Sequence, residues 1–297
     1  MGTVKKVRKK SSPRKKKKSV GIESELNEAV IPSGKSKAPD KLEDYVISIY
    51  GNAGCGKTSL AAQFPGYVVA AFEPHRKGIE MRKVDIPYVS LSGYEKSGDY
   101  RPFQKFCSFI EQAMEDPSVK GIAIDTFNLL FQSAEDFACD EQGIKSPNDA
   151  NDYGKTWRKI QSMVRDIIMV YRTSEKGLVF IDHSVTVDAE ENNEEFRLTQ
   201  PNLRDSQTGS LPIIKESTDM IIYYGVRKGG NRFMQIQPST NVFCKSNIDG
   251  HFMTPKGEQL KQFDVGGSPQ KAYQDLKRAF NNELNNPVPK TKKRGTK

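Results

Sequence analysis

Short, continuous apolar runs alternate along the chain with segments in which apolar residues recur at helical spacing. The apolar runs predict buried strands at residues 45–50, 67–72, 86–89, 121–125, 177–181, 219–224, 233–236 and 242–244. Helical spacing predicts helices over residues 57–64, 102–115, 128–137, 153–173 and 268–283. Because strands alternate with helices, we expect an α/β fold with a mostly parallel sheet flanked by helices. The closing run of strands predicts a C-terminal antiparallel extension.

Polar and charged segments divide the chain into regions. We expect a disordered basic N-terminal tail over residues 1–40, a folded core over residues 41–266, a C-terminal helix over 267–286 and a basic tail over 287–297. Within the core, residues 140–152 are polar and turn-rich, and residues 184–212 predict a long polar loop. Trp157 lies on the apolar face of the helix at 153–173, which favours a role in the core over one as a base-stacking platform.

The segment between the first strand and the first helix matches the complete phosphate-loop pattern G-x-x-x-x-G-K-[ST]. Glycines let backbone N–H groups surround phosphates, the lysine reaches the β- and γ-phosphates, and the hydroxyl group binds Mg²⁺. The flanking strand and helix are the context that this motif requires. We therefore predict a nucleoside triphosphate site at Gly51, Asn52, Ala53, Gly54, Cys55, Gly56, Lys57, Thr58 and Ser59.

A triphosphatase also needs an acid that supports Mg²⁺. Two predicted strands are followed by aspartate, at Asp125 and at Asp182. We favour Asp125, because its strand is the first clear apolar strand with a terminal aspartate after the helix at 102–115. The alternative role for Asp125 is to cap the helix expected to begin at Asn128, and the two roles are compatible.

A further acid, Glu73, follows the strand at 67–72. Ligands of open α/β sheets bind beyond the carboxyl ends of the strands, so an acid there is well placed to activate water opposite the γ-phosphate. The alternative is a surface acid before a turn. We predict that Glu73 is the catalytic base.

The order of these parts resembles that of RecA-like core ATPases: phosphate loop, strand ending in Glu73, strand ending in Asp125, strand ending in Asp182 and His183. More narrowly, the chain resembles the phage nucleotide-binding proteins of that class, which act with single-stranded DNA in recombination and annealing. The resemblance covers about residues 42–250. It implies a RecA-like P-loop fold in which Glu73 is catalytic, Asp125 is the Mg²⁺ acid and His183 senses the γ-phosphate.

The polar residue at the position of His183 couples the nucleotide to DNA in this class; RecA has glutamine there, and a histidine can also donate a hydrogen bond to phosphate. The alternative is a histidine satisfied by local polar groups. The resemblance further implies a homo-oligomer in which a basic residue reaches the neighbouring subunit's ATP. Arg227, Lys228 and Lys245 are the candidates, and ordinary solvated charges are the alternative.

Charge is distributed unevenly along the chain. The whole sequence has 46 Lys and Arg against 37 Asp and Glu, but residues 1–20 carry ten Lys or Arg and no acid, and residues 287–297 carry five and no acid. The rest of the chain is mildly acidic. Like-charge blocks often bind polyanions, so we expect single-stranded DNA at the tails. A merely solubilising tail, or a nuclear import signal at residues 13–18, are the alternatives.

The segment at 184–212 corresponds, in the resemblance, to a DNA-binding loop. Residues 188–195 are strongly acidic, however, and would repel phosphates. Only Arg197, Arg204 and Lys215 offer positive charge nearby. DNA contacts are therefore expected from the later half of this loop or from the tails.

The four cysteines are scattered and form no C-x-x-C pair, which is typical of a reduced, intracellular protein without a cysteine zinc site. No apolar run approaches the roughly 20 residues of a membrane span, and no apolar region follows the N-terminal lysines as in a secretory signal. We expect a cytoplasmic protein of its host cell, or a nuclear one if the host has a nucleus.

The sequence favours an enzyme that hydrolyses ATP with Mg²⁺. Two other functions fit the same phosphate loop. One is a P-loop kinase that phosphorylates a nucleotide or polynucleotide, although residues 184–212 are poor in the arginines expected of a kinase lid. The other is a DNA-binding protein that acts through its basic tails and keeps a regulatory nucleotide site.

Overall fold

The computed structural model describes residues 34, 39–74, 79–191 and 194–284. The chain divides into two units, Met1–Ala38 and Pro39–Lys297, and the helices and strands of the described residues all belong to the second. The predicted basic tails lie almost wholly outside the described residues.

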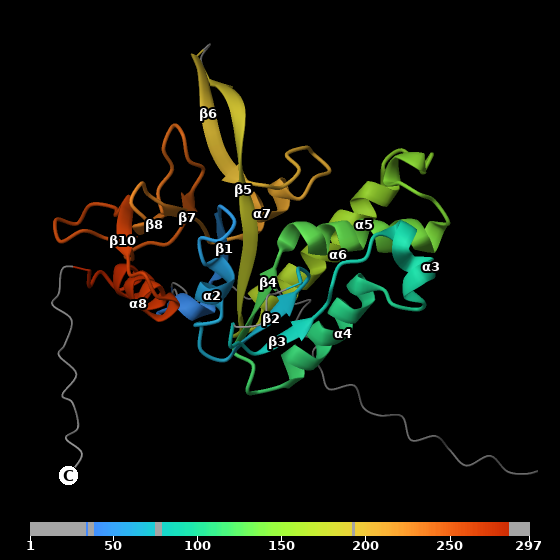
Figure 1. Ribbon diagram of the computed structural model, residues 1–297, viewed down its shortest axis with the longest axis horizontal. Coiled ribbons are helices and arrows are strands. Elements are labelled where there is room, and N and C mark those ends of the chain that lie inside the picture. The colour runs from blue at the N-terminus through green and yellow to red at the C-terminus, as the bar shows by residue number, and fades with distance from the viewer. Residues whose placement is uncertain (1–33, 35–38, 75–78, 192–193, 285–297) are drawn as a thin grey trace, which may run out of the picture. The chain divides into compact units, whose positions relative to one another are not determined.

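Strands and helices alternate over most of the second unit (Figure 1). The strands are β1 (Val46–Gly51), β2 (Tyr67–Ala71), β3 (Lys83–Asp85), β4 (Gly121–Asp125), β5 (Gly177–Glu191), β6 (Glu194–Pro201), β7 (Met220–Val226), β8 (Arg232–Gln235), β9 (Lys245–Ser246) and β10 (Gln262–Val265). The helices are α2 (Lys57–Ala61), α3 (Tyr94–Ser97), α4 (Pro102–Glu115), α5 (Phe127–Gln142), α6 (Lys155–Arg172), α7 (Leu211–Ser217) and α8 (Pro269–Phe280), with short 3₁₀ turns η1 (Leu42–Asp44), η2 (Leu91–Gly93) and η3 (Pro147–Asp149).

The strands form one sheet in the order β10-β8-β7-β1-β5-β4-β2-β3, with β6 paired to β5 and β9 paired to β7. The pairs from β7 through β1, β5, β4 and β2 to β3 are all parallel. The pairs that β8, β9 and β10 make are antiparallel. The predicted fold class is therefore confirmed: a RecA-like P-loop fold with a mostly parallel sheet and antiparallel strands towards its C-terminal end.

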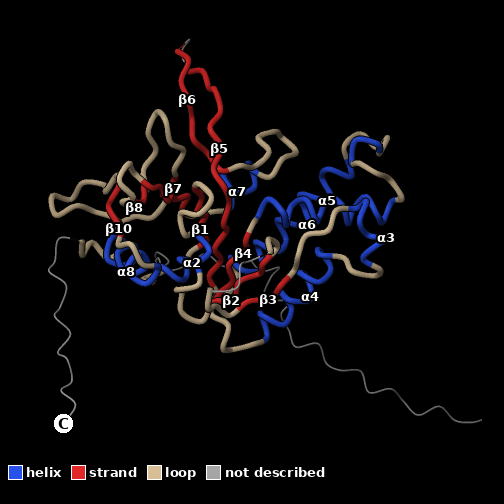
Figure 2. Tube along the Cα trace, viewed as in Figure 1, coloured by secondary structure: helices blue, strands red, loops and turns tan. Residues whose placement is uncertain are grey.

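Helices cover both faces of this sheet (Figure 2). One hydrophobic cluster joins one face to α4, α5, α6 and α7, and the other joins the opposite face to α2 and α8. Alternate residues of a strand point to opposite faces, as Leu178 and Phe180 do towards the first cluster and Val179 and Ile181 towards the second. The central strands are apolar on both faces because both faces are covered.

The prediction of a long loop at 184–212 is wrong. Strand β5 continues through Glu191 and pairs antiparallel with β6, so that Val187 lies opposite Leu198 and Ala189 opposite Phe196. The resulting hairpin extends beyond the neighbouring elements (Figure 1). Its residues alternate between apolar and polar, which is the period of a strand, but the many acids obscured that pattern in the sequence.

Three smaller predictions also differ from the structure. The strand expected at 86–89 lies earlier, at β3, although the N–H groups of Ile86 and Tyr88 still donate to the carbonyl groups of Ala71 and Phe72. The strand expected at 242–244 is wrong: Val242 makes only isolated bridges, and β9 follows at 245–246. Helix α5 runs on to Gln142, into the segment expected to be turn-rich, and ends at Gly143 in the left-handed conformation.

Candidate functional site

The phosphate loop connects β1 to α2, as the motif requires. Gly56 precedes α2 with a φ of 102°, a conformation that favours glycine. Gly51 is required for a different reason: a Cβ atom there would lie 2.1 Å from the carbonyl oxygen of Tyr224 on β7. The two glycines thus allow the tight turn and the close approach of β7 that shape the loop.

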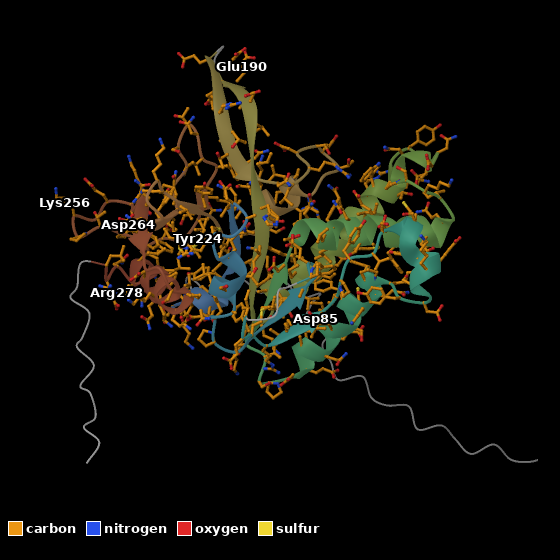
Figure 3. The ribbon with its side chains drawn as sticks, in the orientation of Figure 1. Asp85, Glu190, Tyr224, Lys256, Asp264 and Arg278 are labelled. Atoms are coloured by element: carbon orange, nitrogen blue, oxygen red, sulfur yellow. The ribbon has the colours of Figure 1, made fainter. Side chains whose placement is uncertain are left out.

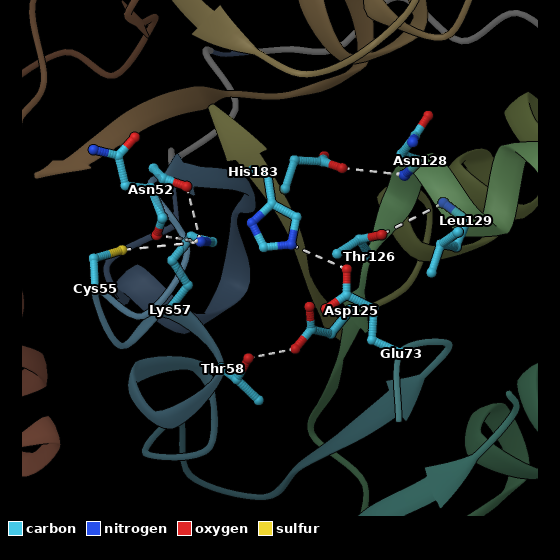
Figure 4. Close-up of polar contacts among 12 residues, drawn as sticks. Asn52, Cys55, Lys57, Thr58, Glu73, Asp125, Thr126, Asn128, Leu129 and His183 are labelled. Carbon is cyan, nitrogen blue, oxygen red and sulfur yellow. Dashed lines mark hydrogen bonds and ion pairs between the residues drawn. The ribbon is translucent and has the colours of Figure 1, made fainter. Parts of the chain in front are cut away.

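Lys57 is the first residue of α2 and is only 5% exposed. Its Nζ donates to the carbonyl oxygens of Gly51 at 2.9 Å and of Asn52 at 3.0 Å, and lies 3.9 Å from Sγ of Cys55 (Figure 4). The ammonium group is therefore held within the loop, where phosphate oxygens would bind. Burial raises the pKa of the Cys55 thiol, so this cysteine is a neutral lining group.

The two residues predicted to serve Mg²⁺ lie together. Oγ1 of Thr58 donates to Oδ2 of Asp125 at 2.5 Å, across 67 residues of sequence. Asp125 is the last residue of β4 and is buried. Helix α5 begins at Phe127 with Thr126 as its N-cap, so the alternative in which Asp125 caps this helix is wrong.

A hydroxyl and a carboxylate suit Mg²⁺, which favours oxygen ligands and keeps several water molecules and phosphate oxygens in its shell. Among the described residues, no group of three or more His, Cys, Asp or Glu is placed to hold a metal ion. Thr58 and Asp125, a hydroxyl and a carboxylate, fit Mg²⁺.

Asp182, the other candidate acid, is fully buried. Its Oδ1 accepts a hydrogen bond from the backbone N–H of Asn128 at 3.1 Å, while among the described residues its Oδ2 has no hydrogen-bond partner. Burial raises the pKa of this carboxyl group well above its ordinary value, against the opposing effect of the Asn128 N–H group. The contact of Thr58 with Asp125 favours Asp125 over Asp182 as the acid of the metal site.

Glu73 and His183 meet at the same edge of the sheet. Nε2 of His183 lies 3.1 Å from Oε1 of Glu73, and the two side chains are 39% and 35% exposed. Glu73 is therefore a partly exposed acid near a turn, and His183 has a local polar partner, which is Glu73 itself. Both side chains remain open enough to meet a ligand.

The strand register explains why these residues converge. Gly51 of β1 lies opposite His183 of β5, Ile181 of β5 opposite Asp125 of β4, and Asp125 opposite Ala71 of β2. Since parallel strands lie about 4.8 Å apart, the carboxyl ends of β1 and β2 are about 14 Å apart, with the other two strands between them. This distance is suited to a triphosphate, its metal and the attacking water.

Three contacts to the phosphate loop were not predicted. Nε of Arg232, on β8, donates to the carbonyl oxygen of Cys55 at 3.0 Å, across 177 residues. Oγ of Ser184 donates to Oδ1 of Asn52 at 2.6 Å. The backbone of Tyr224 packs on Gly51. Apart from the polar run at 182–184, no sequence signal points to these contacts, because they depend on the order of the strands.

The candidates for a residue acting in a neighbouring subunit differ in their surroundings. Arg227 pairs with Asp264 and stacks on Phe233. Nζ of Lys245 donates to the carbonyl oxygens of Lys215 and Thr218. Lys228 is exposed in the turn between β7 and β8, Arg227 is also exposed, and Lys245 is half-buried.

Trp157 is half-buried and packs against the first hydrophobic cluster, as predicted. Its Nε1 donates to Oδ1 of Asn148, and the guanidinium group of Arg204 lies 5.0 Å from the centre of its ring. These contacts and the packing against the first hydrophobic cluster hold the indole against the fold.

A protein-family model described as an AAA domain matches residues 43–248. The chain belongs to the AAA domain family. The match begins just before β1 and extends past β9, so the AAA domain includes the phosphate loop, Glu73, Asp125 and His183. Membership of this family of P-loop ATPases confirms the predicted class of nucleotide-binding protein at the level of the family.

Among solved structures, the AAA domain is similar to the crystal structure of a KaiC-like protein from the hyperthermophilic archaeon Pyrococcus horikoshii. The two share 11% sequence identity over 77% of this chain and 88% of that chain, with a TM-score of 0.40. A search of curated proteins finds no match. In the described part of the chain, none of the helices is both long and apolar enough for a membrane span.

Proposed function

We propose that this protein binds and hydrolyses ATP with Mg²⁺ and acts with single-stranded DNA, in recombination, annealing or replication of the phage type. The observation that carries the ATPase part is the convergence of Lys57, Thr58, Asp125, Glu73 and His183 at the carboxyl ends of four adjacent strands. A phosphate loop alone binds nucleotide. A carboxylate opposite the loop adds the group that hydrolysis needs.

Each side chain has a defined task in this proposal. Lys57 and the loop N–H groups bind the phosphates, and Thr58 with Asp125 holds the cation, which when bound neutralises charge on the phosphate oxygens. Glu73 orients the attacking water and accepts its proton. His183 senses the γ-phosphate. If its ring nitrogen donates a hydrogen bond to that phosphate, its contact with the carboxylate of Glu73 must change.

The choice of DNA contact follows from charge. Each of the three basic residues expected near the hairpin is paired with an acid: Arg197 with Asp188, Arg204 with Glu135 and Lys215 with Asp205. Glu190 lies near the free end of the acidic hairpin (Figure 3). The basic segments at 1–20 and 287–297 are therefore the favoured DNA contact, since phosphate neutralisation supplies most of non-specific affinity.

A homo-oligomer completes the proposal. Lys228 is exposed at the tip of the β7–β8 hairpin, next to the strand whose Arg232 contacts the phosphate loop. In an oligomer, the ammonium group of this exposed lysine would contact the nucleotide of a neighbouring subunit. Lys228 is not needed for nucleotide binding within its own subunit.

An ATPase assay with and without single-stranded DNA, at low and at moderate salt, tests the proposal. We expect Mg²⁺-dependent phosphate release that single strands stimulate, with the stimulation declining as salt rises. Transfer of the γ-phosphate to a nucleotide or polynucleotide in place of water would favour the kinase alternative. ATP binding without turnover would favour a DNA-binding protein with a regulatory nucleotide site.

A further inference from the structure

Asp182 is a buried acid that the proposed chemistry does not use. It is 0% exposed, and its Oδ2 atom makes no hydrogen bond to any described residue. A buried polar atom without a partner costs about 1–3 kcal/mol, and a buried charge costs more. An apolar residue would avoid this cost, so the acid at this position calls for a functional reason.

The position of Asp182 on β5 links three parts of the site. Asp182 bonds the first turn of α5, His183 contacts Glu73, and Ser184 bonds Asn52 of the phosphate loop. Because side chains alternate along a strand, Asp182 points to the α5 face and His183 to the opposite one. Three consecutive residues of one strand thus contact α5, the end of β2 and the phosphate loop.

The bond that Asp182 makes bears directly on the metal acid. Asp125 ends β4, Thr126 caps α5, and Asn128 is the second residue of the helix. Oγ1 of Thr126 accepts from the N–H of Leu129, and Oδ1 of Asp182 accepts from the N–H of Asn128. The turn that carries Asp125 is therefore fixed from both sides, by its own cap and by the neighbouring strand.

We propose that Asp182 is a positioning residue: by holding the first turn of α5 against β5, it fixes the carboxylate of Asp125 where Thr58 and the cation need it. The inference rests on the proposed ATPase function. Burial raises the pKa of the Asp182 carboxyl group, which favours its neutral form. The neutral acid still accepts the Asn128 hydrogen bond through its carbonyl oxygen. An asparagine offers the same acceptor in the same shape, whereas alanine offers none.

The alternative is a merely structural role, in which Asp182 contributes to folding and nothing else. Loss of a partner that orients a metal-binding carboxylate typically costs about 10–100-fold in metal affinity or activity. A structural role would lower the thermal stability without changing the Mg²⁺ concentration that gives half-maximal rate. The Mg²⁺ titration therefore separates the two roles.

The experiment measures ATP hydrolysis by the full-length chain as a function of Mg²⁺ concentration, for the wild type and for Asp182→Asn and Asp182→Ala. We expect Asp182→Asn to stay within about threefold of the wild type and Asp182→Ala to need about tenfold more Mg²⁺ for half-maximal rate. Glu135→Gln is the matched control. Glu135, on α5, is also a buried acid, but its partner is Arg204, away from the phosphate loop.

A folded Asp182→Ala protein with a wild-type rate and Mg²⁺ requirement would overturn the proposal. If Asp182→Ala does not fold, Asn128→Pro removes the same hydrogen bond from the helix side, at a position in the first turn where proline is tolerated. An unchanged Mg²⁺ requirement in that variant would likewise overturn it. Absence of hydrolysis by the wild type itself would instead contradict the proposed function.

Discussion

Nε2 of His183 lies 3.1 Å from Oε1 of Glu73, although 110 residues separate them in the sequence. The contact exists because β5 and β2 run in the same direction and end at the same edge of the sheet, with β4 between them. The residue expected to sense the γ-phosphate is thus joined to the residue expected to activate water. A substitution of His183 should therefore alter the position of Glu73, and the reverse.

Replacing His183 tests this link. His183→Ala removes the donor, so we expect the turnover number to fall by about tenfold or more, and stimulation by single-stranded DNA to disappear. ATP binding should change little, because Lys57 and the loop are untouched. His183→Gln, which keeps a hydrogen-bond donor, should retain part of the stimulation. Steady-state ATPase assays alongside a nucleotide-binding assay measure both; an Ala variant with full DNA stimulation would contradict the sensing role.

The contact between Thr58 and Asp125 predicts a shared effect on metal use. Thr58→Ala and Asp125→Asn each remove one oxygen ligand or its charge, so each should raise the Mg²⁺ concentration for half-maximal hydrolysis by about tenfold or more. The measurement is a Mg²⁺ titration of the initial rate at saturating ATP. Thr186→Ala, on the exposed hairpin, is the control. Wild-type Mg²⁺ dependence in both site variants would show that the cation binds elsewhere.

The buried acid Asp182 predicts a pH-dependent stability difference. Burial raises its pKa, so the folded chain retains a proton that the unfolded chain has released. The raised pKa lowers the free energy of unfolding. This loss is absent below the ordinary pKa of about 3.9 and grows with pH until the folded-state pKa is reached. Asp182→Asn has no titrating group and does not suffer this loss. We expect the unfolding free energy of this variant, relative to the wild type, to rise between pH 5 and 8.

The rise in that difference is at most about 1.4 kcal/mol per pH unit for a single group. Urea unfolding at several pH values measures it. A difference that stays constant, or that shrinks as the pH rises, would mean that Asp182 is ionised in the folded chain.

The basic tails are expected to supply most of the DNA affinity. Deleting residues 1–20 and 287–297 removes fifteen Lys and Arg side chains, so single-stranded DNA binding should weaken strongly and depend less on salt. ATP hydrolysis without DNA should be unchanged. Fluorescence anisotropy with a labelled oligonucleotide is the measurement. Arg197→Ala is the comparison, because Arg197 is paired with Asp188; a loss as large as that of the tail deletion would place the DNA contact on the hairpin.

Much of the fold follows from local pattern in the sequence. The apolar run before the phosphate loop and the apolar strand before Asp125 were predicted with nearly their observed bounds, because a buried strand is apolar throughout. The β5–β6 hairpin was missed because its apolar positions, such as Val187 and Phe196, alternate with acids and face no core cluster. The sequence shows that alternation only once the pairing is known.

The candidate site divides in the same way. Lys57 and Thr58 are identified by a contiguous motif, and Asp125 and Glu73 by their places after strands. The contact of Arg232 with Cys55 is set by the position of β8 next to β7, which in turn pairs with β1, and no local pattern encodes that order. The bond between Asp182 and Asn128 likewise depends on the packing of α5 against β5.

The most direct test of the central claim is a single-turnover measurement of ATP hydrolysis by Glu73→Gln, with ATP binding measured on the same protein. Glutamine keeps the shape of the side chain and its contact with His183 but cannot accept a proton. The account predicts wild-type ATP binding with hydrolysis reduced by about 100-fold or more, whereas Lys57→Ala should lose binding itself. Normal hydrolysis by Glu73→Gln would contradict the assignment of Glu73 as the base.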